Sequence, residues 1–408
     1  MAKNRRPRLP AAEATAIDKS MALDRSRSGT VDLTFRAIDE LAHVHDPIWE
    51  DVSALAVIGR SIFCTCDETA TIERVVLDEA GTNAAGHANF PLGEAFDLPD
   101  GPSGEMDIEG LAIADGYLWI CGSHSLKRDD PEEGGLADME DIDWDPNRGF
   151  LGRVPLIDRG DGVFEPVAAI DALDGVPGRR AAMVKMSKSS RTPIRKMLAK
   201  DALIGPFVDH PCKENGLDIE GLAVQGDTVL LGLRGPVIGG HAMIVRLEMK
   251  ETGSGALKPR KLENGQRYQL QAVDLDGQAI RDLEWRDDRL LILTGATTDL
   301  EAMQSVVVID DYDPGRPVYQ AGLLARILDL PVIRGSDHAE GLATIGIDGQ
   351  DRLLVAYDSP HETRTDAALR RLTTDLFEIA EAAAQSDRPA PAAKKGGKKR
   401  KARSRQHA

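Results

Sequence analysis

One acidic hexapeptide occurs twice in this chain, as Asp-Ile-Glu-Gly-Leu-Ala at Asp107–Ala112 and again at Asp218–Ala223. Degenerate copies occur at Asp51–Ala56, Asp282–Trp285 and His338–Ala343. Self-similarity of this kind is typical of an architecture built from repeated units, each burying its apolar face against its neighbours. Five copies of the motif therefore predict five copies of one structural unit.

The segments around each motif have the pattern of antiparallel strands. A short apolar run begins within the motif, a tight polar turn such as Asp115-Gly116 follows, and a second apolar run comes after the turn. Gly and Asp tolerate the positive φ of tight turns, so each copy predicts a hairpin. Predicted second strands cover Ile62–Cys66, Tyr117–Cys121, Val229–Leu233, Leu290–Thr294 and Leu353–Tyr357, and predicted third strands cover Ile72–Leu77, Phe150–Leu156, Met243–Leu247 and Ser305–Ile309.

A fourth strand, with an Asp after an apolar residue near its end, completes each predicted unit. These segments are Ala95–Leu98, Ala169–Asp171, Ala272–Leu275, Arg326–Leu330 and, near the N-terminus, Phe35–Asp39. Because the last of these precedes the first motif, an N-terminal strand would complete the final unit and close a ring. Four-stranded antiparallel units in a closed ring describe an all-β fold, the β-propeller, whose closure protects the sheet edges.

The spacing of the motifs leaves the number of blades open. Successive motifs begin at 51, 107, 218, 282 and 337, so one interval is about twice as long as the others. A hidden sixth blade would fill it, but the region of about 175–212 lacks a hairpin pattern. Within it, Thr192–Lys200 has the pattern of a helix with Pro near its start. Five blades with one helical insert are the preferred prediction, and six blades are the alternative.

Charge is divided unevenly along the chain. The formal net charge is −17, yet residues 386–408 carry a net +8, which leaves −25 on the remainder. An acidic body repels nucleic acid and anionic membranes, whereas the basic residues from Lys394 to Arg405 would attract nucleic acid weakly. We therefore predict disordered basic segments at 1–30 and 381–408 around a single domain at 31–380.

Neither the N-terminus nor the cysteines indicate export. The basic start of the chain is not followed by an apolar stretch, so it does not resemble a secretory signal, and no apolar run reaches the roughly 20 residues of a membrane span. Cys64, Cys66, Cys121 and Cys212 show no pairing or zinc spacing. These features predict a soluble, cytoplasmic protein with reduced thiols.

Strand direction alternates within a blade, so all the motifs are expected on one face, close to the axis. Carboxylates that converge there would suit a hard cation such as Ca²⁺ or Mg²⁺. The alternative is that each Glu accepts backbone N–H bonds from the next blade and pins the two together, with Gly allowing the close approach. The candidate metal ligands are Asp107, Glu109, Asp218, Glu220, Asp282, Glu284 and Glu340, and His338 replaces one Asp.

Cationic side chains near this face suggest an anionic ligand. Lys127, Arg128, Lys213 and Arg234 are the candidate anion-binding residues, and His124 or His338 would carry a proton. One hypothesis is a cation-assisted hydrolase of a phosphoester or similar anionic substrate. The other is a non-catalytic propeller that binds a small ligand or a peptide. The fold alone does not choose between them, because propellers host both.

Two segments carry a resemblance to a known family. Lys213–Ala223, followed by Gly232–Pro236, resembles the hallmark of the bacterial family known as domain of unknown function 3616, and Gly122–Ser125 fits the same pattern. The resemblance covers roughly Val31 to Glu378. The shorter Glu-Gly-Leu-Ala element also resembles phytase-like and esterase-like propeller domains. The resemblance implies a propeller and a bacterial source, and it supplies neither a reaction nor catalytic residues.

Overall fold

The structure is a computed structural model, and it describes residues 27–379 except 39–43, 45, 130, 132–134, 174–175, 254, 299–301, 332 and 334. The described part is mostly β, and α2 (Pro193–Leu198) is its one α-helix. Within it, no helix combines the length and apolar character needed to cross a membrane. Most strands belong to five antiparallel groups.

The first and last groups are joined. The first group comprises β2 (Ala54–Ile58), β3 (Ser61–Thr65), β4 (Thr71–Leu77) and β5 (Asn83–Pro91), paired in that order. The last comprises β25 (His338–Ile347), β26 (Gln350–Asp358), β28 (Arg371–Glu378) and the N-terminal β1 (Arg27–Thr34), with β27 (Thr365–Asp366) beside β28. Strand β1 is antiparallel to β28 and also pairs briefly in parallel with β5, so the two groups form one nine-stranded sheet.

The other three groups lie between these two in the sequence. The second comprises β6 (Ile108–Ala114), β7 (Tyr117–Gly122) and β10 (Leu151–Asp158), with β11 (Phe164–Pro166) and β14 (Ala182–Met183) on β10. The third comprises β15 (Asp218–Gln225), β16 (Thr228–Gly235), β17 (Ala242–Glu251) and β19 (Gln269–Val273), flanked by β18 (Leu257–Pro259) and β23 (Val318–Tyr319). The fourth comprises β20 (Ala279–Arg286), β21 (Arg289–Gly295), β22 (Ser305–Ile309) and β24 (Ala325–Asp329). Two short ladders, β8 (Lys127–Arg128) with β9 (Ile142–Asp143) and β12 (Ala169–Ile170) with β13 (Arg179–Arg180), stand apart.

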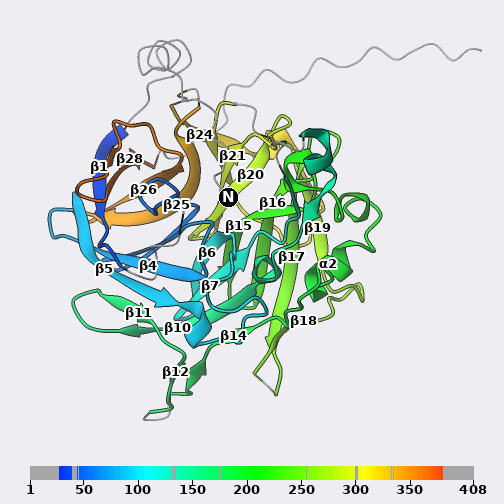
Figure 1. Cartoon of the computed structure of the whole chain (residues 1–408), viewed down its shortest axis with the longest axis horizontal. Helices are drawn as coiled ribbons and strands as arrows, with labels where there is room; N and C mark the ends of the chain where they lie inside the picture. Colours follow the sequence, from blue (N-terminus) through cyan, green and yellow to red (C-terminus); the bar gives the residue numbers. More distant parts are fainter. Residues whose placement is uncertain are drawn as a thin grey trace, which may run out of the picture.

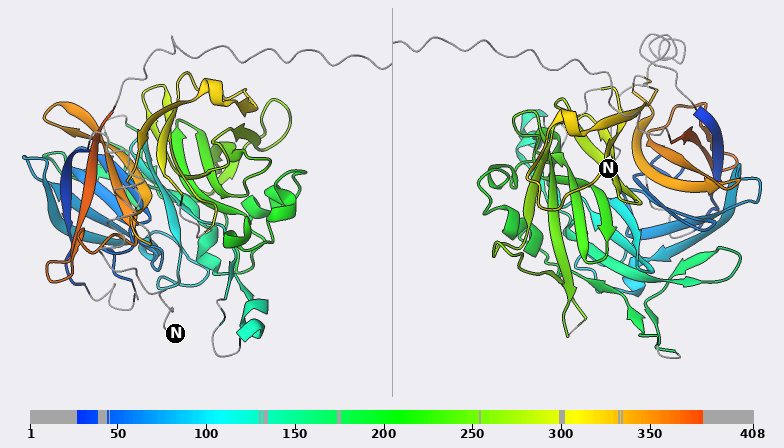
Figure 2. Two further views of the ribbon diagram at one scale, coloured as in Figure 1. Left: turned by 90° about the horizontal axis from the view of Figure 1, so that it is seen from above. Right: turned by 180° about the vertical axis from the view of Figure 1, so that it is seen from behind.

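The first strand of each group touches the first strands of two other groups. Strand β2 contacts β6 and β25, β15 contacts β6 and β20, and β20 contacts β25. In Figure 1, β6, β15, β20 and β25 surround the middle of the view, whereas β1, β5 and β19 lie towards its rim. The views in Figure 2 show the sheets side by side around this centre. The motif-bearing strands therefore form the middle of the molecule.

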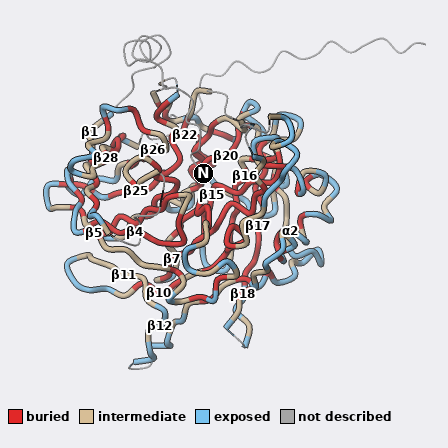
Figure 3. The backbone as a smooth tube through the Cα atoms, viewed as in Figure 1, coloured by how far each residue is buried: buried red, intermediate tan, exposed pale blue. Residues whose placement is uncertain are grey.

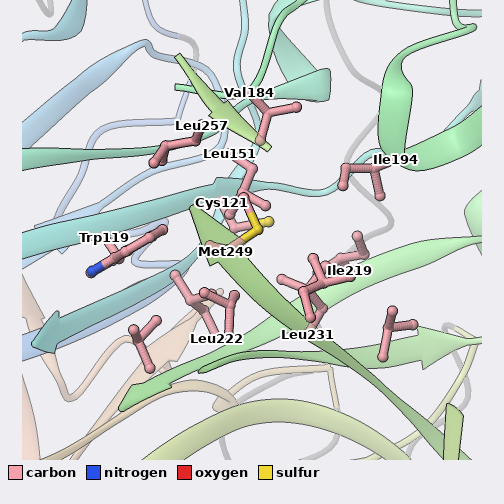
Figure 4. Packing of buried hydrophobic residues seen from close by; sticks show 14 of the residues in the cluster. Trp119, Cys121, Leu151, Val184, Ile194, Ile219, Leu222, Leu231, Met249 and Leu257 are labelled. Atoms are coloured by element: carbon pink, nitrogen blue, oxygen red, sulfur yellow. The ribbon is translucent and has the colours of Figure 1, made fainter. Parts of the chain in front are cut away.

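Apolar side chains fill the space between neighbouring sheets. Figure 3 shows buried backbone concentrated on the strands and exposed backbone in the loops. Between the second and third sheets, Trp119, Leu222 and Met249 belong to one buried cluster, which Figure 4 shows together with Ile194 of the insert. Helix α2 begins where Thr192 accepts a hydrogen bond from the Arg195 N–H, with Pro193 in the first turn. The insert is thus packed into the core.

Several predicted strands match the structure closely. The segment Ser305–Ile309 is β22 in full, and Ala272–Leu275 and Arg326–Leu330 overlap β19 and β24. The prediction for Ala95–Leu98 was wrong, because it follows the 3-10 turn η2 (Leu92–Glu94) and β5 is the fourth strand. Strand β5 is rich in Asn, Gly and Ala and has little apolar pattern to reveal it.

Four other predicted segments differ from the structure. The N-terminal strand is β1, which ends before Phe35; the Phe35 N–H bonds the Arg370 carbonyl, and Asp39 lies outside the described residues. Ala169 and Ile170 pair with β13 and not with the third strand β10. The predicted helical insert at 175–212 contains β13, β14 and only a six-residue helix. Of the predicted disordered ends, residues 27–30 belong to β1, and residues 1–26 and 381–408 lie outside the described part.

Candidate functional site

An irregularity in strand pairing occurs at the same place in four motif strands. In β6, β15, β20 and β25, the ladder shifts where the motif begins, and one residue is left out of the register. A bulge of this kind re-aims the side chain of the extra residue. The four residues concerned are Glu109, Glu220, Arg281 and Glu340.

These shifts correct the alignment of the fourth motif by three residues. Arg281 occupies the position of the motif Glu, and Asp282 occupies that of the motif Gly. Packing agrees: a Cβ on Gly110 would lie 2.6 Å from Leu222, and one on Gly221 would lie 2.8 Å from Leu283. The motif Gly therefore admits the motif Leu of the next sheet, and this contact defines equivalence better than the spacing of acidic residues does.

Arg281 links two of the motif carboxylates. Its Nε lies 2.9 Å from Glu220 Oε2, and its guanidinium also pairs with Glu340. Arg234 approaches Glu220 from the other side, with Nη1 2.8 Å from Oε1 and 3.6 Å from Asp218 Oδ2. The Arg234 contact is also a charge-assisted hydrogen bond, whereas Arg281 Nε and Glu220 Oε2 form an ion pair without one. The buried charge of Glu220 is thereby compensated by two arginines.

A third arginine compensates Asp107. Arg148, in the loop before β10, places Nη1 2.9 Å from Asp107 Oδ2 and also pairs with Glu105. The same guanidinium donates a hydrogen bond to Ser125 Oγ at 2.8 Å. Asp107 is therefore held in a fixed position at the start of β6.

Glu109 differs from the other motif carboxylates because it has no cationic partner among the described residues. It is 7% exposed, and no described residue donates a hydrogen bond to it or forms an ion pair with it. Burial, together with the negative charges of Asp67, Glu220 and Asp107, raises the pKa of Glu109 well above its usual value. One oxygen from each of Asp67, Asp107 and Glu109 lies within 4.8 Å of the others. Oxygen ligands in such proximity suit a hard cation.

We name Asp67, Asp107, Glu109, Asp218 and Glu220 the acidic centre. Within it, burial raises the pKa of Asp218 to about 7, although the charge of Arg234 opposes that rise. Asp218 therefore changes its protonation near neutral pH, where a group that exchanges protons is most useful.

Asp282 and Glu284 lie in contacts that join sheets. Asp282 accepts the backbone N–H of Leu342 at 2.9 Å, and Glu284 accepts that of Thr344 at 3.2 Å. Both acceptors belong to β20 and both donors to β25. The expectation that motif carboxylates pin neighbouring sheets therefore describes these two residues, whereas Glu340 pairs with Arg281.

Three of the candidate anion-binding residues are paired with protein carboxylates. Lys127 lies 2.9 Å from Asp145 and 3.3 Å from Glu105, and Arg128 pairs with Glu214. Arg234 pairs within the acidic centre, as described above. Lys213 is exposed in the 3-10 turn η6 (Cys212–Glu214).

The two histidines occupy different environments. The His124 ring is fully buried, and burial, assisted by the charge of Arg195, lowers its pKa to about 3. Neither of its nitrogens has a hydrogen-bond partner of acceptable geometry among the described residues, although the Phe150 backbone is close enough to favour protonation slightly. His338 is 46% exposed, with Nδ1 3.8 Å from Asp358 Oδ2. His338 is therefore the one of the two that solvent reaches.

Four site residues escaped the sequence analysis. Asp67 follows β3, and the polar sequence Asp67-Glu68-Thr69 after that strand was a signal for it. There was no sequence signal for Arg148 or Arg281, because neither residue belongs to a recognised motif. Cys212 lies close enough to Asp218 and Arg234 for their charges to act on it, and burial raises the pKa of its thiol to about 12.

A family model described as "Protein of unknown function (DUF3616)" matches residues 51–375. The chain belongs to this family. The match includes all five motif copies, the insert and every residue of the acidic centre, and it confirms the resemblance found in the sequence. Membership in DUF3616 names no reaction.

Solved structures with some similarity to this DUF3616 chain have very different sequences. Glutaminyl cyclase of Myxococcus xanthus is 12% identical, with 86% of this chain and 98% of that chain covered and a TM-score of 0.34. A putative oxidoreductase (glucose dehydrogenase) of Thermus thermophilus is 13% identical, with 80% and 97% covered and a TM-score of 0.34. The WD40 β-propeller domain of Doa1 is 7% identical, with 87% and 97% covered and a TM-score of 0.32. No curated protein matches the chain. With TM-scores below 0.5, we transfer neither activity nor ligand from these structures.

Proposed function

We propose that this DUF3616 chain is a five-bladed β-propeller closed by β1. The cycle of contacts among β2, β6, β15, β20 and β25 supports this architecture, as does the pairing of β1 with β28. The contact of Gly341 in the last group of strands with Leu55 in the first group repeats the contact of Gly110 with Leu222. Each inner strand would then be the first strand of one blade.

We further propose that the acidic centre binds a hard divalent cation, Ca²⁺ or Mg²⁺, through Asp67, Asp107 and Glu109. The observation that carries this proposal is the environment of Glu109: it is nine-tenths buried, lacks a donor among the described residues, and lies beside two other carboxylates. An uncompensated buried charge is costly, so the site gains free energy from either a proton or a cation. A cation satisfies all three carboxylates together.

The reaction class that fits such a site is hydrolysis of a phosphoester or similar anionic substrate. A bound cation would polarise the substrate and make a bound water more acidic. Asp218, with a pKa of about 7, would accept or release a proton beside it. Arg148 and Arg234 would hold Asp107 and Asp218 in place, through the ion pairs at 2.9 and 3.6 Å.

A second candidate is a non-catalytic, cation-dependent ligand-binding propeller. It is favoured by one specific observation: Lys127, Arg128 and Arg234 all pair with protein carboxylates. None of the three has its charge free for a substrate. In this case the cation itself would provide the positive charge that holds the ligand.

Calorimetric titration with Ca²⁺ and Mg²⁺ after chelator treatment tests the cation site. We expect saturable binding by the native chain and at least roughly tenfold weaker binding by Glu109→Gln, since a ligand charge is lost. Glu284→Gln is the matched control: it removes a half-buried motif-strand carboxylate that already has a backbone donor, and affinity should be unchanged. Absence of binding by the native chain, or equal loss in both variants, excludes the site.

Activity then separates the two candidates. Aryl phosphomonoesters and phosphodiesters would be assayed with each cation and with excess chelator. Turnover that disappears with chelator and with Glu109→Gln supports the hydrolase. Cation binding without turnover of any ester supports the binding propeller.

A further inference from the structure

A pocket lies at the opposite ends of the strands that carry the acidic centre. Strand β15 begins at Asp218 and ends at Gln225, and β20 ends just after Trp285. Between these ends is a cavity of about 370 Å³, within the roughly 300–1,000 Å³ typical of small-molecule sites. Its lining includes Gln225, Thr228, Trp285, Asp288, Asp311 and Tyr312.

Two aromatic rings form a rigid corner of this pocket. The Trp285 and Tyr312 rings are 5.2 Å apart with an interplanar angle of 89°. Tyr312 also stacks on Tyr319 at 5.9 Å, and its hydroxyl donates a hydrogen bond to Gln271 Oε1. Tyr319 is in turn fixed by its hydroxyl, which bonds the Asp313 carbonyl at 2.8 Å. The corner is therefore ordered before any ligand arrives, which lowers the entropic cost of binding.

The charged groups that line the pocket are negative. Asp288 and Asp311 line it, and neither forms an ion pair with another described residue. The adjacent Asp310, by contrast, is paired with Arg289 at 3.0 Å. In the part of the chain that the structure describes, no Lys or Arg side chain lines the pocket. Aromatic faces and carboxylates together attract cations, because the ring quadrupole presents negative charge at its face.

We propose that this pocket binds an organic ammonium ion. Trp285 and Tyr312 would form two walls around the ammonium group, and Asp288 and Asp311 would balance its charge. This site is independent of the acidic centre, because it shares none of its residues.

Choline and its uncharged isostere 3,3-dimethyl-1-butanol provide a direct test on the full chain. We expect choline to bind in a calorimetric titration and the isostere to bind at least about tenfold more weakly, the factor expected for a desolvated cation–π contact. Equal affinity for the two compounds overturns the proposal. Binding of glucose but not choline overturns it as well, because the pocket would then recognise hydroxyl groups. If a trimethyllysine peptide binds more tightly than choline, the natural ammonium ligand belongs to a protein partner. If choline binds more tightly, the ligand is a free metabolite.

Variants locate the binding in this pocket. Asp311→Asn should weaken choline binding about three- to tenfold, since it removes one carboxylate and Asn tolerates the φ of 53° found there. Asp287→Asn is the matched control: it is a neighbour of Asp288, also has a φ of 53°, and does not line the pocket. Trp285→Phe should weaken binding further, and Glu109→Gln should leave it unchanged. Unaltered binding in Asp311→Asn and Trp285→Phe would refute the assignment.

Discussion

Leu55 in the first group of strands packs directly against the backbone of Gly341 in the last group. A Cβ on Gly341 would lie 2.7 Å from Leu55 Cγ, too close for the strands to keep their positions. We therefore expect Gly341→Ala to lower the free energy of unfolding by about 1–3 kcal/mol, as overpacking does. Gly346 lies on the same strand with nothing within 4 Å of its virtual Cβ. Gly346→Ala should be neutral or slightly stabilising, and urea denaturation of both variants measures the difference. Equal costs would show that β2 and β25 are not in close contact at Gly341.

Replacing Glu109 and Glu220 should have opposite effects on stability in the absence of cations. Glu109→Gln removes a buried charge without a donor among the described residues, so the free energy of unfolding in chelator should stay level or rise. Glu220→Gln leaves Arg234 and Arg281 without their shared carboxylate, which we expect to cost about 3–5 kcal/mol. Thermal and chemical denaturation of both variants at pH 8 provide the comparison. A loss of similar size in Glu109→Gln would mean that Glu109 has a structural role.

The stability of the cation-free protein should fall as pH rises from about 4 to 7. Asp218 and Glu284 have pKa values of about 7 when folded, and burial raises the pKa of Glu109 and Asp282 too. Between their unfolded and folded pKa values, these groups bind more protons in the folded state. Each such group therefore lowers the free energy of unfolding by about 1.4 kcal/mol per pH unit between its unfolded and folded pKa values. Below its unfolded pKa it has no effect on stability. Urea denaturation at pH 5 and pH 8 measures the trend.

A cation bound at Glu109 should flatten this dependence, because it favours the ionised carboxylate. Saturating Ca²⁺ or Mg²⁺ should raise stability mainly at the alkaline end, by mass action on the folded state. Glu109→Gln should respond to neither cation. Stability that instead rises from pH 5 to pH 8 in chelator would contradict the raised pKa values of the acidic centre.

Cys212 should react slowly with thiol reagents. Its thiol pKa is about 12, and the other three cysteines are fully buried. At pH 8 the thiolate fraction would be about a thousandfold below that of an ordinary cysteine, and alkylation by iodoacetamide depends on the thiolate. Mass spectrometry of the native and denatured chain gives the ratio of rates. Alkylation at the rate of a free cysteine would show that the pKa of the Cys212 thiol is not raised.

The N-terminal strand should be essential, whereas the residues before it should not. A chain that starts at Arg27 retains β1, with the buried Val31 and Leu33. A chain that starts at residue 40 loses β1 and its pairing with β28, and it should be insoluble or unfolded. Circular dichroism and size-exclusion chromatography distinguish these outcomes. A folded product from the longer deletion would show that β28 is a stable edge.

Sequence periodicity predicted the inner strands well and the outer ones unevenly. Inner strands such as β15 (Asp218–Gln225) are buried on both faces and contain apolar runs. The outer strand β5 is half exposed, with the pattern broken by Gly86 and Asn89, so its position could not be inferred from hydrophobicity. Short turns marked by Asp and Gly located every hairpin between first and second strands.

The location of the candidate site could be predicted from the sequence, but its full set of residues could not. The repeated Asp-x-Glu correctly placed Asp107, Glu109, Asp218 and Glu220 together. It misaligned Asp282 and Glu284, since two acidic residues at the same spacing imitate the motif. The arginines of the site lie outside any repeated pattern, and which carboxylates they neutralise depends on contacts between distant segments.

Arg281 shows how a repeated sequence acquires one unique place. Five identical units around an axis would create five equivalent positions, and a single bound ion would have no reason to prefer one of them. By replacing one acidic side chain with a basic one, the chain cancels the charge on Glu220 and Glu340 and leaves that on Glu109. The irregular copy thus distinguishes Glu109 from Glu220 and Glu340, and we expect one bound cation per chain.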